Sequence, residues 1–338
     1  MTDYFRPLVQ IGPARPDTAV SLAGGWGWFT HAEVLSRSTP PRVVPAADIP
    51  ASVMARLTAP RPAMAGLTLD RPRIMGILNT TPDSFSDGGQ HNAVPDALRV
   101  AQEMVAAGAD ILDIGGESTR PGADFVPVSE EITRTAPVIA ALRGAGLHTP
   151  ISIDTRKAAV AEAAVNAGAN LVNDVSGFTF DPALGPLCQK LALPVCVMHA
   201  QGDPATMHLD PQYDNVLLDV FDALERQISM LEASGIPRGA ILADPGIGFG
   251  KTQDHNLALL ARLSLFHVLG TPILLGVSRK RFIGTIGNAP QAQDRAPGSI
   301  AVALAGLGQG VQMIRVHDVD DTRQAVALWH AAYFGSIL

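Results

Sequence analysis

Residues 74–89 read IMGILNTTPDSFSDGG, an apolar run that passes directly into a polar loop ending in two glycines. A short apolar run bounded by a polar loop is typical of a buried strand. In α/β enzymes the loops that follow the carboxyl ends of the strands carry the active site. The stretch therefore predicts a buried strand, and it places candidate site residues from Asn79 onward.

The same pattern recurs along the chain. Further apolar runs, each followed by polar residues, occupy 111–114, 151–153, 171–172, 195–198, 241–243, 273–277 and 313–316. Alanine-rich amphipathic stretches between them predict helices at 95–107, 129–143, 157–167, 215–233 and 320–332, several closed by Gly108, Gly144, Gly168 or Gly235. Alternating strands and helices imply parallel strands with right-handed crossovers, and eight such units close most simply into a (β/α)₈ TIM barrel. A doubly wound open sheet is the alternative.

The first part of the chain differs in composition. Residues 1–65 are rich in proline, glycine and alanine, and the prolines interrupt any long element. We expect an irregular N-terminal extension there, including a turn-rich packing element at Gly24-Gly25-Trp26-Gly27-Trp28. Residues 66–338 then form the barrel.

Composition excludes several classes of protein. The formal net charge of −7 argues against a nucleic-acid binder, because such proteins concentrate Lys and Arg on one face. No apolar stretch approaches the ~18 residues that would cross a membrane, and the amino terminus lacks the pattern of a secretory signal. Cys188 and Cys196 have no metal-ligand spacing and are expected to be buried free thiols. The chain is therefore expected in the cytoplasm.

Polar residues follow every expected strand. The set comprises Asn79, Glu117, Ser118, Thr119, Arg120, Asp154, Asn173, Asp174, His199, Asp244, Ser278, Arg279, Lys280, Arg315, His317 and Asp318. Any one of them could simply cap a helix or a turn. Because a barrel brings all strand ends to one mouth, we expect these residues to form one site.

The residue types indicate what such a site binds. Asp154, Asn173 and Asp244 can accept hydrogen bonds from the donor edge of a planar heterocycle such as a pterin or a purine. Arg315 and His317 alternate on one strand and so share a face, and an arginine can grip a phosphate with two hydrogen bonds. The Asn79 oxygen suits Mg²⁺, which binds mainly through substrate phosphates.

One motif resembles a nucleotide-binding loop. Gly246-Ile247-Gly248-Phe249-Gly250-Lys251-Thr252 has the ending of a P-loop, but the pattern requires a glycine where Pro245 stands. We therefore do not expect binding of a nucleoside triphosphate. The histidines at 199, 208 and 255 have no zinc-site spacing.

Six ordered motifs resemble the signatures of the dihydropteroate synthase family of pterin-binding enzymes, over roughly residues 66–338. They are Asn79 to Gly89, Asp113 to Gly122, Asn173 to Gly177, Asp244 to Lys251, Ser278 to Lys280 and Arg315 to Asp318. The resemblance implies a barrel transferase that condenses 6-hydroxymethyl-7,8-dihydropterin diphosphate with 4-aminobenzoate, forming dihydropteroate for folate synthesis. It also implies Mg²⁺ as cofactor, small molecules as the only substrates, and a homodimer.

The resemblance assigns roles residue by residue. Asp87, Lys280 and Arg315 are implied to be catalytic, and Asn79 is implied to ligate the metal. The implied pterin diphosphate contacts are Thr119, Asp154, Asn173, Met198, Asp244, Lys280, Arg315 and His317. The implied aminobenzoate and lid residues are Phe85, Arg120, Pro121, Phe249 and Ser278.

Two other functions fit part of the pattern. A pterin-binding methyltransferase domain would share the barrel and the Asp, Asn and Asp pterin contacts, but the loop from Phe85 to Gly89 and Ser278-Arg279-Lys280 favour the synthase. A catalytically silent pterin-binding paralogue is the second alternative, and the presence of Asn79, Lys280, Arg315 and His317 argues against it.

Overall fold

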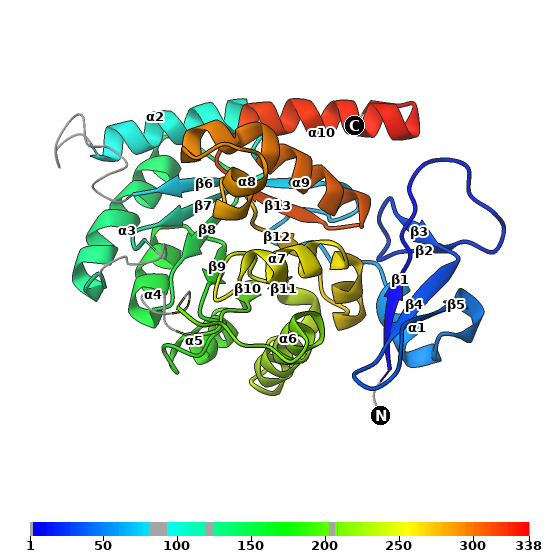
Figure 1. Ribbon diagram of the computed structural model, residues 1–338. Helices are drawn as coiled ribbons and strands as arrows, with labels where there is room; N and C mark the ends of the chain where they lie inside the picture. Colours follow the sequence, from blue (N-terminus) through cyan, green and yellow to red (C-terminus); the bar gives the residue numbers. More distant parts are fainter. Residues whose placement is uncertain (1–2, 81–92, 119–124, 203–206, 208, 338) are drawn as a thin grey trace.

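The computed structural model describes residues 3–80, 93–118, 125–202, 207 and 209–337 (Figure 1). Its largest sheet has the strand order β11-β10-β9-β8-β7-β6-β13-β12, with all neighbours parallel. The strands are β6 (Arg73–Asn79), β7 (Ile111–Gly115), β8 (Ile151–Asp154), β9 (Leu171–Asp174), β10 (Val195–Met198), β11 (Ile241–Asp244), β12 (Leu274–Leu275) and β13 (Met313–Val316). A parallel bridge between Ala243 and Ile273 joins the two end strands, so the sheet closes. The predicted barrel is confirmed, and each of the eight apolar runs forms one strand.

Helices surround this sheet on its outer face (Figure 1). They are α2 (Ala93–Ala106), α3 (Val128–Gly144), α4 (Ala158–Ala167), α5 (Leu184–Lys190), α6 (Val216–Ala233), α7 (Gln253–Leu260), α8 (Arg281–Ile286), α9 (Ala296–Gly308) and α10 (Val319–Phe334), with short 3₁₀ segments η3 (Arg238–Ala240), η4 (Leu263–Leu269) and η5 (Ala292–Arg295). The glycine signals work as expected at Gly168, which ends α4 in the left-handed region at φ 117°. Gly144 differs, because it is the last residue of α3 and the left-handed turn follows at Gly146.

The strands divide the core into two layers. One set of strand residues packs inside the barrel near the start of the strands: Met75, Ile111, Leu171, Cys196, Leu242, Leu274 and Met313. Their strand neighbours, such as Ile74, Ile241 and Ile314, pack outward in the larger cluster beneath the helices. This alternation follows from the two-residue period of a strand, and it leaves the carboxyl ends of the strands for polar side chains.

The N-terminal extension contains more regular structure than the sequence pattern predicts. β1 (Tyr4–Pro7), β4 (His31–Leu35) and β5 (Arg42–Pro45) form an antiparallel sheet. β2 (Val20–Ser21) pairs with β3 (Trp28–Phe29), and η1 (Ala46–Asp48) precedes α1 (Ala51–Thr58). Strands this short show no readable alternation between prolines, which explains why composition alone suggested an irregular segment.

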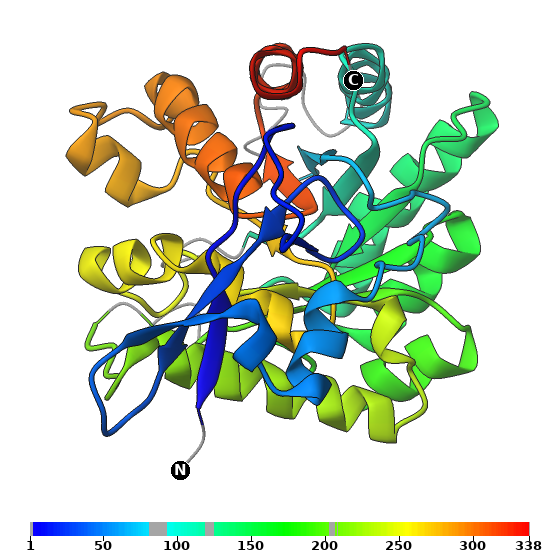
Figure 2. The same ribbon diagram turned by 90° about the vertical axis from the view of Figure 1, so that its right-hand side faces the viewer.

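The extension lies across one end of the barrel (Figure 2). Met64 of the extension, together with Leu69 just beyond it, belongs to the cluster inside the barrel that is built from residues near the strand starts. On the outside, the Trp26 indole donates to the Leu307 carbonyl of α9 (2.9 Å), and its ring meets Trp329 of α10 edge-on. The extension therefore covers the amino-terminal end of the barrel, opposite the strand ends that carry the polar residues.

Cys188 and Cys196 are buried free thiols, as predicted. Within the described ranges, the structure has no helix both long enough and apolar enough to span a bilayer.

Candidate active site

The sheet register sets the candidate residues side by side at the barrel mouth. Asn79 is paired with Gly115, Gly115 with Asp154, and Asp154 with Asn173 across the β6, β7, β8 and β9 strands. Met198 at the end of β10 is paired with Asp244 at the end of β11. The strand ends that were expected to converge therefore do so, because the carboxyl ends of neighbouring parallel strands lie on the same face of the barrel.

A charged cluster occupies the centre of this mouth. The Arg315 guanidinium on β13 donates through Nε to Asp113 Oδ2 (2.5 Å) and through Nη2 to Asp154 Oδ2 (2.7 Å). Asn173 donates from Nδ2 to the same Asp113 oxygen (3.1 Å). Four strands thus contribute to one network, which pre-positions Arg315, Asp154 and Asn173 relative to one another.

Burial sets the charge state of this cluster. Removal from water raises the pKa of Asp154 to about 7, because Arg315 only partly offsets the cost of burial and of the neighbouring carboxylates. Burial alone would lower the pKa of Arg315, but Asp113 and Asp154 outweigh it and raise that pKa above its ordinary value. Arg315 therefore stays charged. Asp113 Oδ1 is buried and has no hydrogen-bond partner in the part of the chain that the structure describes.

Asp244 ends β11 and begins the glycine-rich loop. Its Oδ1 accepts from the Gly246 N–H (2.7 Å). Burial raises the pKa of Asp244 to about 6, while that N–H, Lys280 and Arg315 lower it. The loop then runs to Phe249, whose ring centroid lies 4.0 Å from Lys280 Nζ. This contact joins the expected pterin side, at Asp244 and Lys280, to the expected aminobenzoate side at Phe249.

The loops after β12 and β13 are tied to each other. Ser278 Oγ lies 2.9 Å from His317 Nδ1 and accepts from the His317 N–H (3.1 Å). Arg279 has a left-handed backbone (φ 58°), which its N–H to Ser299 Oγ and its guanidinium to the Asp318 carboxylate hold in place. These bonds fix Ser278 and Lys280 on either side of Arg279.

Buried ion pairs hold the described ends of the loop between β7 and α3. Lys157 Nζ contacts Glu131 Oε2 (2.6 Å), Glu117 Oε1 (3.1 Å) and the Val126 carbonyl (2.6 Å). Glu117 Oε1 in turn accepts from the Val126 N–H (3.0 Å). Both backbone groups of Val126 are therefore bound where the chain returns from this loop.

Several expected site residues lie outside the described residues. They are Phe85 and Asp87 in the first loop and Thr119, Arg120 and Pro121 in the second. For the remaining candidates, the structure links Asp154, Asn173 and Arg315 in one network, Lys280 with Phe249, and Ser278 with His317.

The part of the chain that forms this mouth matches a known protein family. The model of the pterin binding enzymes matches residues 75–317, which include every strand end described above. The chain belongs to the pterin-binding enzyme family. Relatives 44–45% identical to this chain are dihydropteroate synthases, in line with the resemblance of the six motifs.

Relatives of this pterin-binding enzyme are similar over most of their length. The dihydropteroate synthase of Escherichia coli K12 is 45% identical over 255 residues, which cover 75% of this chain and 89% of that enzyme. The Synechocystis enzyme is 44% identical over 257 residues. A structure of the Xanthomonas albilineans dihydropteroate synthase with 4-aminobenzoic acid has a TM-score of 0.75, 45% identity, and covers 79% of this chain and 96% of its own. The Yersinia pestis enzyme, solved as a sulfonamide drug complex, has the same TM-score at 46% identity.

Sequence reasoning overlooked two residues of the site in this pterin-binding enzyme. Asp113 lies in the family motif Asp113 to Gly122 without an expected role, yet it anchors both Arg315 and Asn173. A single carboxylate inside the apolar run 111–114 was the available signal. Lys251 stands in the loop that resembles a nucleotide-binding motif and at the end of the family motif Asp244 to Lys251, and neither gives it a role; it is 5% exposed, and its ammonium lies among backbone carbonyls beside His199.

The residues present fit a hard cation held mainly by substrate. No cluster of three or more His, Cys, Asp or Glu side chains that could hold a metal occurs among the described residues. Asn79 is half-buried at the end of β6, and within the described ranges its side chain makes no hydrogen bond. A single amide oxygen is appropriate for Mg²⁺ that takes most of its ligands from phosphates and water.

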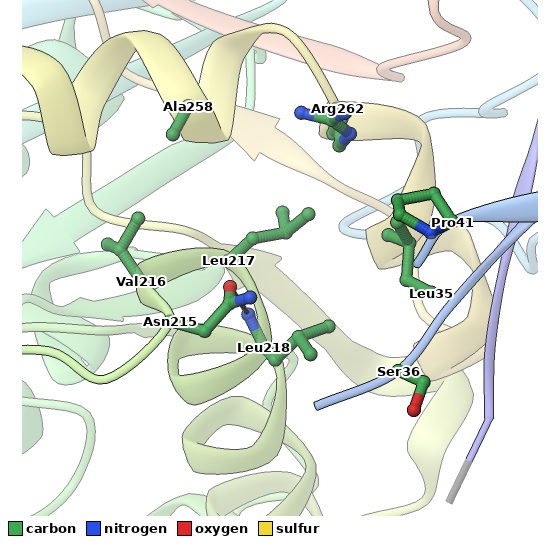
Figure 3. Close-up of a pocket in the computed structure, with 9 residues that line it drawn as sticks. All are labelled: Leu35, Ser36, Pro41, Asn215, Val216, Leu217, Leu218, Ala258 and Arg262. Atoms are coloured by element: carbon green, nitrogen blue, oxygen red, sulfur yellow. Dashed lines mark hydrogen bonds between the residues drawn. The ribbon is translucent and has the colours of Figure 1, made fainter. Parts of the chain in front are cut away.

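A separate cavity lies away from the strand ends, between the extension and the barrel (Figure 3). It measures about 340 Å³ and is lined by Leu35 and Pro41 of the extension, and by Leu217, Leu218 and Arg262 among the barrel residues. Its walls are mainly aliphatic and none of the expected site residues faces it. We therefore place the candidate active site at the strand ends.

Proposed function

We propose that this chain is a dihydropteroate synthase, which condenses 6-hydroxymethyl-7,8-dihydropterin diphosphate with 4-aminobenzoate and releases diphosphate. The proposal is carried by the network of Arg315, Asp113, Asp154 and Asn173 at the barrel mouth. It is supported by curated synthases 44–45% identical to this chain and by similar structures with 4-aminobenzoic acid or 7,8-dihydropteroate.

The pterin ring suits the polar floor of the site. Asp154, Asn173 and Asp244 present carboxylate and amide oxygens, which accept from ring N–H and amino groups. Met198, buried beside Asp244, offers an apolar contact to the ring. Lys280 supplies a cation next to Asp244, which favours the ionised carboxylate.

The reaction breaks the bond between the pterin methylene carbon and the diphosphate oxygen, and the diphosphate leaves with the electron pair. Arg315 and His317, from one strand and the loop after it, can stabilise the departing negative charge, together with Thr119. Donors fixed in this way are commonly worth ~3–4 kcal/mol each in the transition state. Mg²⁺ bound near Asn79 would supply further charge neutralisation to the diphosphate.

The second substrate then completes the exchange. The aniline nitrogen of 4-aminobenzoate attacks the methylene carbon with its lone pair and loses a proton. Phe249 and Ser278 would line its pocket, and Phe85, Arg120 and Pro121 would close over it. In the dissociative form of this mechanism Asp87 would stabilise the positive charge on the pterin while water is excluded.

The decisive experiment measures product and diphosphate together. We expect the full chain to release diphosphate and form dihydropteroate when pterin diphosphate, 4-aminobenzoate and Mg²⁺ are all present. Replacing Asn173 with Leu should abolish product formation at subsaturating pterin, because the leucine cannot pair with the ring. Binding of pterin without dihydropteroate formation under every condition would instead identify a silent paralogue, and methyl transfer from methyltetrahydrofolate would identify the methyltransferase alternative.

The cellular setting belongs to the same proposal. We propose a homodimer in the cytoplasm, which the family resemblance implies. The buried free thiols are consistent with a reducing compartment.

A further inference from the structure

Lys251 is a buried lysine that has no role in the proposed reaction. It follows the loop Gly246 to Gly250 after β11 and is 5% exposed. Its Nζ lies 2.9 Å from each of the Gly246 and Phe249 carbonyl oxygens, 3.3 Å from the His199 carbonyl oxygen and 2.9 Å from His199 Nδ1. All four acceptors are uncharged, which is unusual because a buried ammonium is normally paired with a carboxylate.

These acceptors belong to two separate segments of the mouth. Gly246 and Phe249 are in the loop after β11, whereas His199 directly follows β10. The segments touch so closely that a Cβ added at Gly246, which has φ 66°, would lie 1.9 Å from the His199 carbonyl oxygen. Tyr213, whose ring centroid lies 6.1 Å from that of His199, also donates through its hydroxyl to the Gly250 carbonyl (2.8 Å). The Lys251 ammonium is thus the junction that fastens the loop to the end of β10.

The fastened loop carries contacts to both proposed substrates. At its start, Gly246 donates to Asp244, which is proposed to read the pterin. Toward its end, Phe249 presents its ring to Lys280 in the proposed aminobenzoate pocket. The Asp244 end is also fixed by the strand register, whereas the Phe249 carbonyl is bound by Lys251.

We propose that Lys251 is a positioning residue for the aromatic amine substrate, because it holds the loop so that Phe249 lines the second pocket. The inference rests on the proposed synthase function. Lys251 acts through Phe249 and does not contact the reacting atoms. Its loss is therefore expected to affect the affinity for 4-aminobenzoate more than that for the pterin.

The protonation state of Lys251 offers a readout that a simple packing role lacks. Burial lowers the pKa of Lys251 to about 7, with Asp244 raising it and Lys280 lowering it. Burial also lowers the pKa of His199 to about 3, so the imidazole is neutral and its Nδ1 can accept from the ammonium. The charged or titratable groups that face Lys251 and His199 are Asp244, Lys280, Tyr213 and Arg226. Above about pH 7 the neutral amine has two N–H donors in place of three, so one of the hydrogen bonds from Lys251 that hold the loop is lost.

The test compares Lys251→Met and Lys251→Gln with the wild type, and uses Lys190→Met on the exposed surface of α5 as the matched control. We expect Lys251→Met to raise the KM for 4-aminobenzoate about tenfold, as the loss of charge-assisted hydrogen bonds predicts, with the KM for pterin diphosphate changed less than about threefold. Lys251→Gln, which keeps a donor, should fall between Met and wild type. Equal increases in both KM values, or no increase, would overturn the proposal.

A pH series needs no variant and excludes a folding artefact. In the wild type, the KM for 4-aminobenzoate should rise between pH 6 and pH 8, while the ionisable groups of the aminobenzoate itself titrate in more acidic solution. This rise should be absent in Lys251→Met, although any acid limb due to Asp244 should remain. A wild-type KM for 4-aminobenzoate that does not change between pH 6 and pH 8 would overturn the inference. If the wild type and Lys190→Met make no dihydropteroate at all, the proposed function fails as well, so the two failures are distinguishable.

Discussion

Asp244 illustrates how a buried site residue can lower the stability of the folded protein. Burial raises the pKa of its carboxyl to about 6, above the ordinary value near 4. The folded protein therefore binds the proton more tightly than the unfolded chain does. Stability from this group is present in acid and is lost as the pH rises through about 6, so at neutral pH the ionised Asp244 is a burden on the fold.

We predict that Asp244→Asn becomes increasingly more stable than the wild type as the pH rises from 4.5 to 7.5. The asparagine oxygen can still accept from the Gly246 N–H, while the buried charge is gone. A shift of about two pKa units sets a ceiling of about 3 kcal/mol on the gain. Urea unfolding at several pH values measures it, with Asp17→Asn on the exposed surface as control. A stability difference that does not change with pH contradicts this account of Asp244.

Individual site residues were predictable where the chemistry is local. Asp154, Asn173 and Asp244 end their strands, and the pattern of an apolar run followed by a polar residue indicated each of them. Arg315 lies within β13, and its alternation with His317 indicated it. Asp113 and Lys251 escaped because their roles depend on partners from other strands. Sequence spacing carries no signal that Arg315 would meet Asp113, 202 residues away.

Among the secondary-structure elements, the ion pairs around Lys157 connect α3 to the start of α4. Glu131 in the first turn of α3 is fully buried, and its carboxylate has the Lys157 ammonium and the Thr155 hydroxyl (2.7 Å) as partners. Glu117 has Arg156 as a second cation. Loss of Lys157 would therefore leave the Glu131 carboxylate without a cation, whereas Glu117 would keep Arg156.

We predict that Lys157→Met destabilises the protein by about 3–5 kcal/mol, because it leaves the Glu131 carboxylate buried without a cation. Adding Glu131→Gln to the same chain should restore part of the loss. The free energy of urea unfolding gives both values. Arg99→Met is the control: its pair with Glu103 is 60% and 62% exposed at the two side chains, and its removal should change stability by less than about 1 kcal/mol. Similar losses in the free energy of unfolding for Lys157→Met and Arg99→Met would refute the importance of burial for this ion pair.

The elements themselves were predicted better than the contacts between them. Long helices such as α3, α6 and α10 and all eight strands follow from hydrophobic periodicity and glycine stops, with ends displaced by one or two residues. The strands of the extension were missed because each has only two to five residues. Their stability comes from packing against η4 and α6, for example the Tyr4 ring against Phe221, which no local pattern records.

The barrel has two ends with different tasks. Polar side chains from the strand ends form the candidate site at one end, and the extension covers the other. The family model begins only at residue 75, so the extension is outside the region that defines the family. Met64 of the extension nevertheless shares one buried cluster with residues of the barrel strands. The extension is therefore part of the core of this protein, although it takes no part in the proposed chemistry.

We predict that Met64→Ala lowers the free energy of unfolding by about 2–5 kcal/mol, the usual cost of truncating a fully buried methionine. Met64 is 2% exposed, so a cavity would open beneath the barrel strands. Val43→Ala, in the same extension but at a side chain 60% exposed, should change stability by no more than about 0.5 kcal/mol. Because Met64 lies at the end opposite the site, kcat and both KM values of the folded Met64→Ala enzyme should equal those of the wild type. A small stability loss would mean that the extension packs only weakly on the barrel, and a loss of activity without a loss of stability would mean that the two ends are coupled.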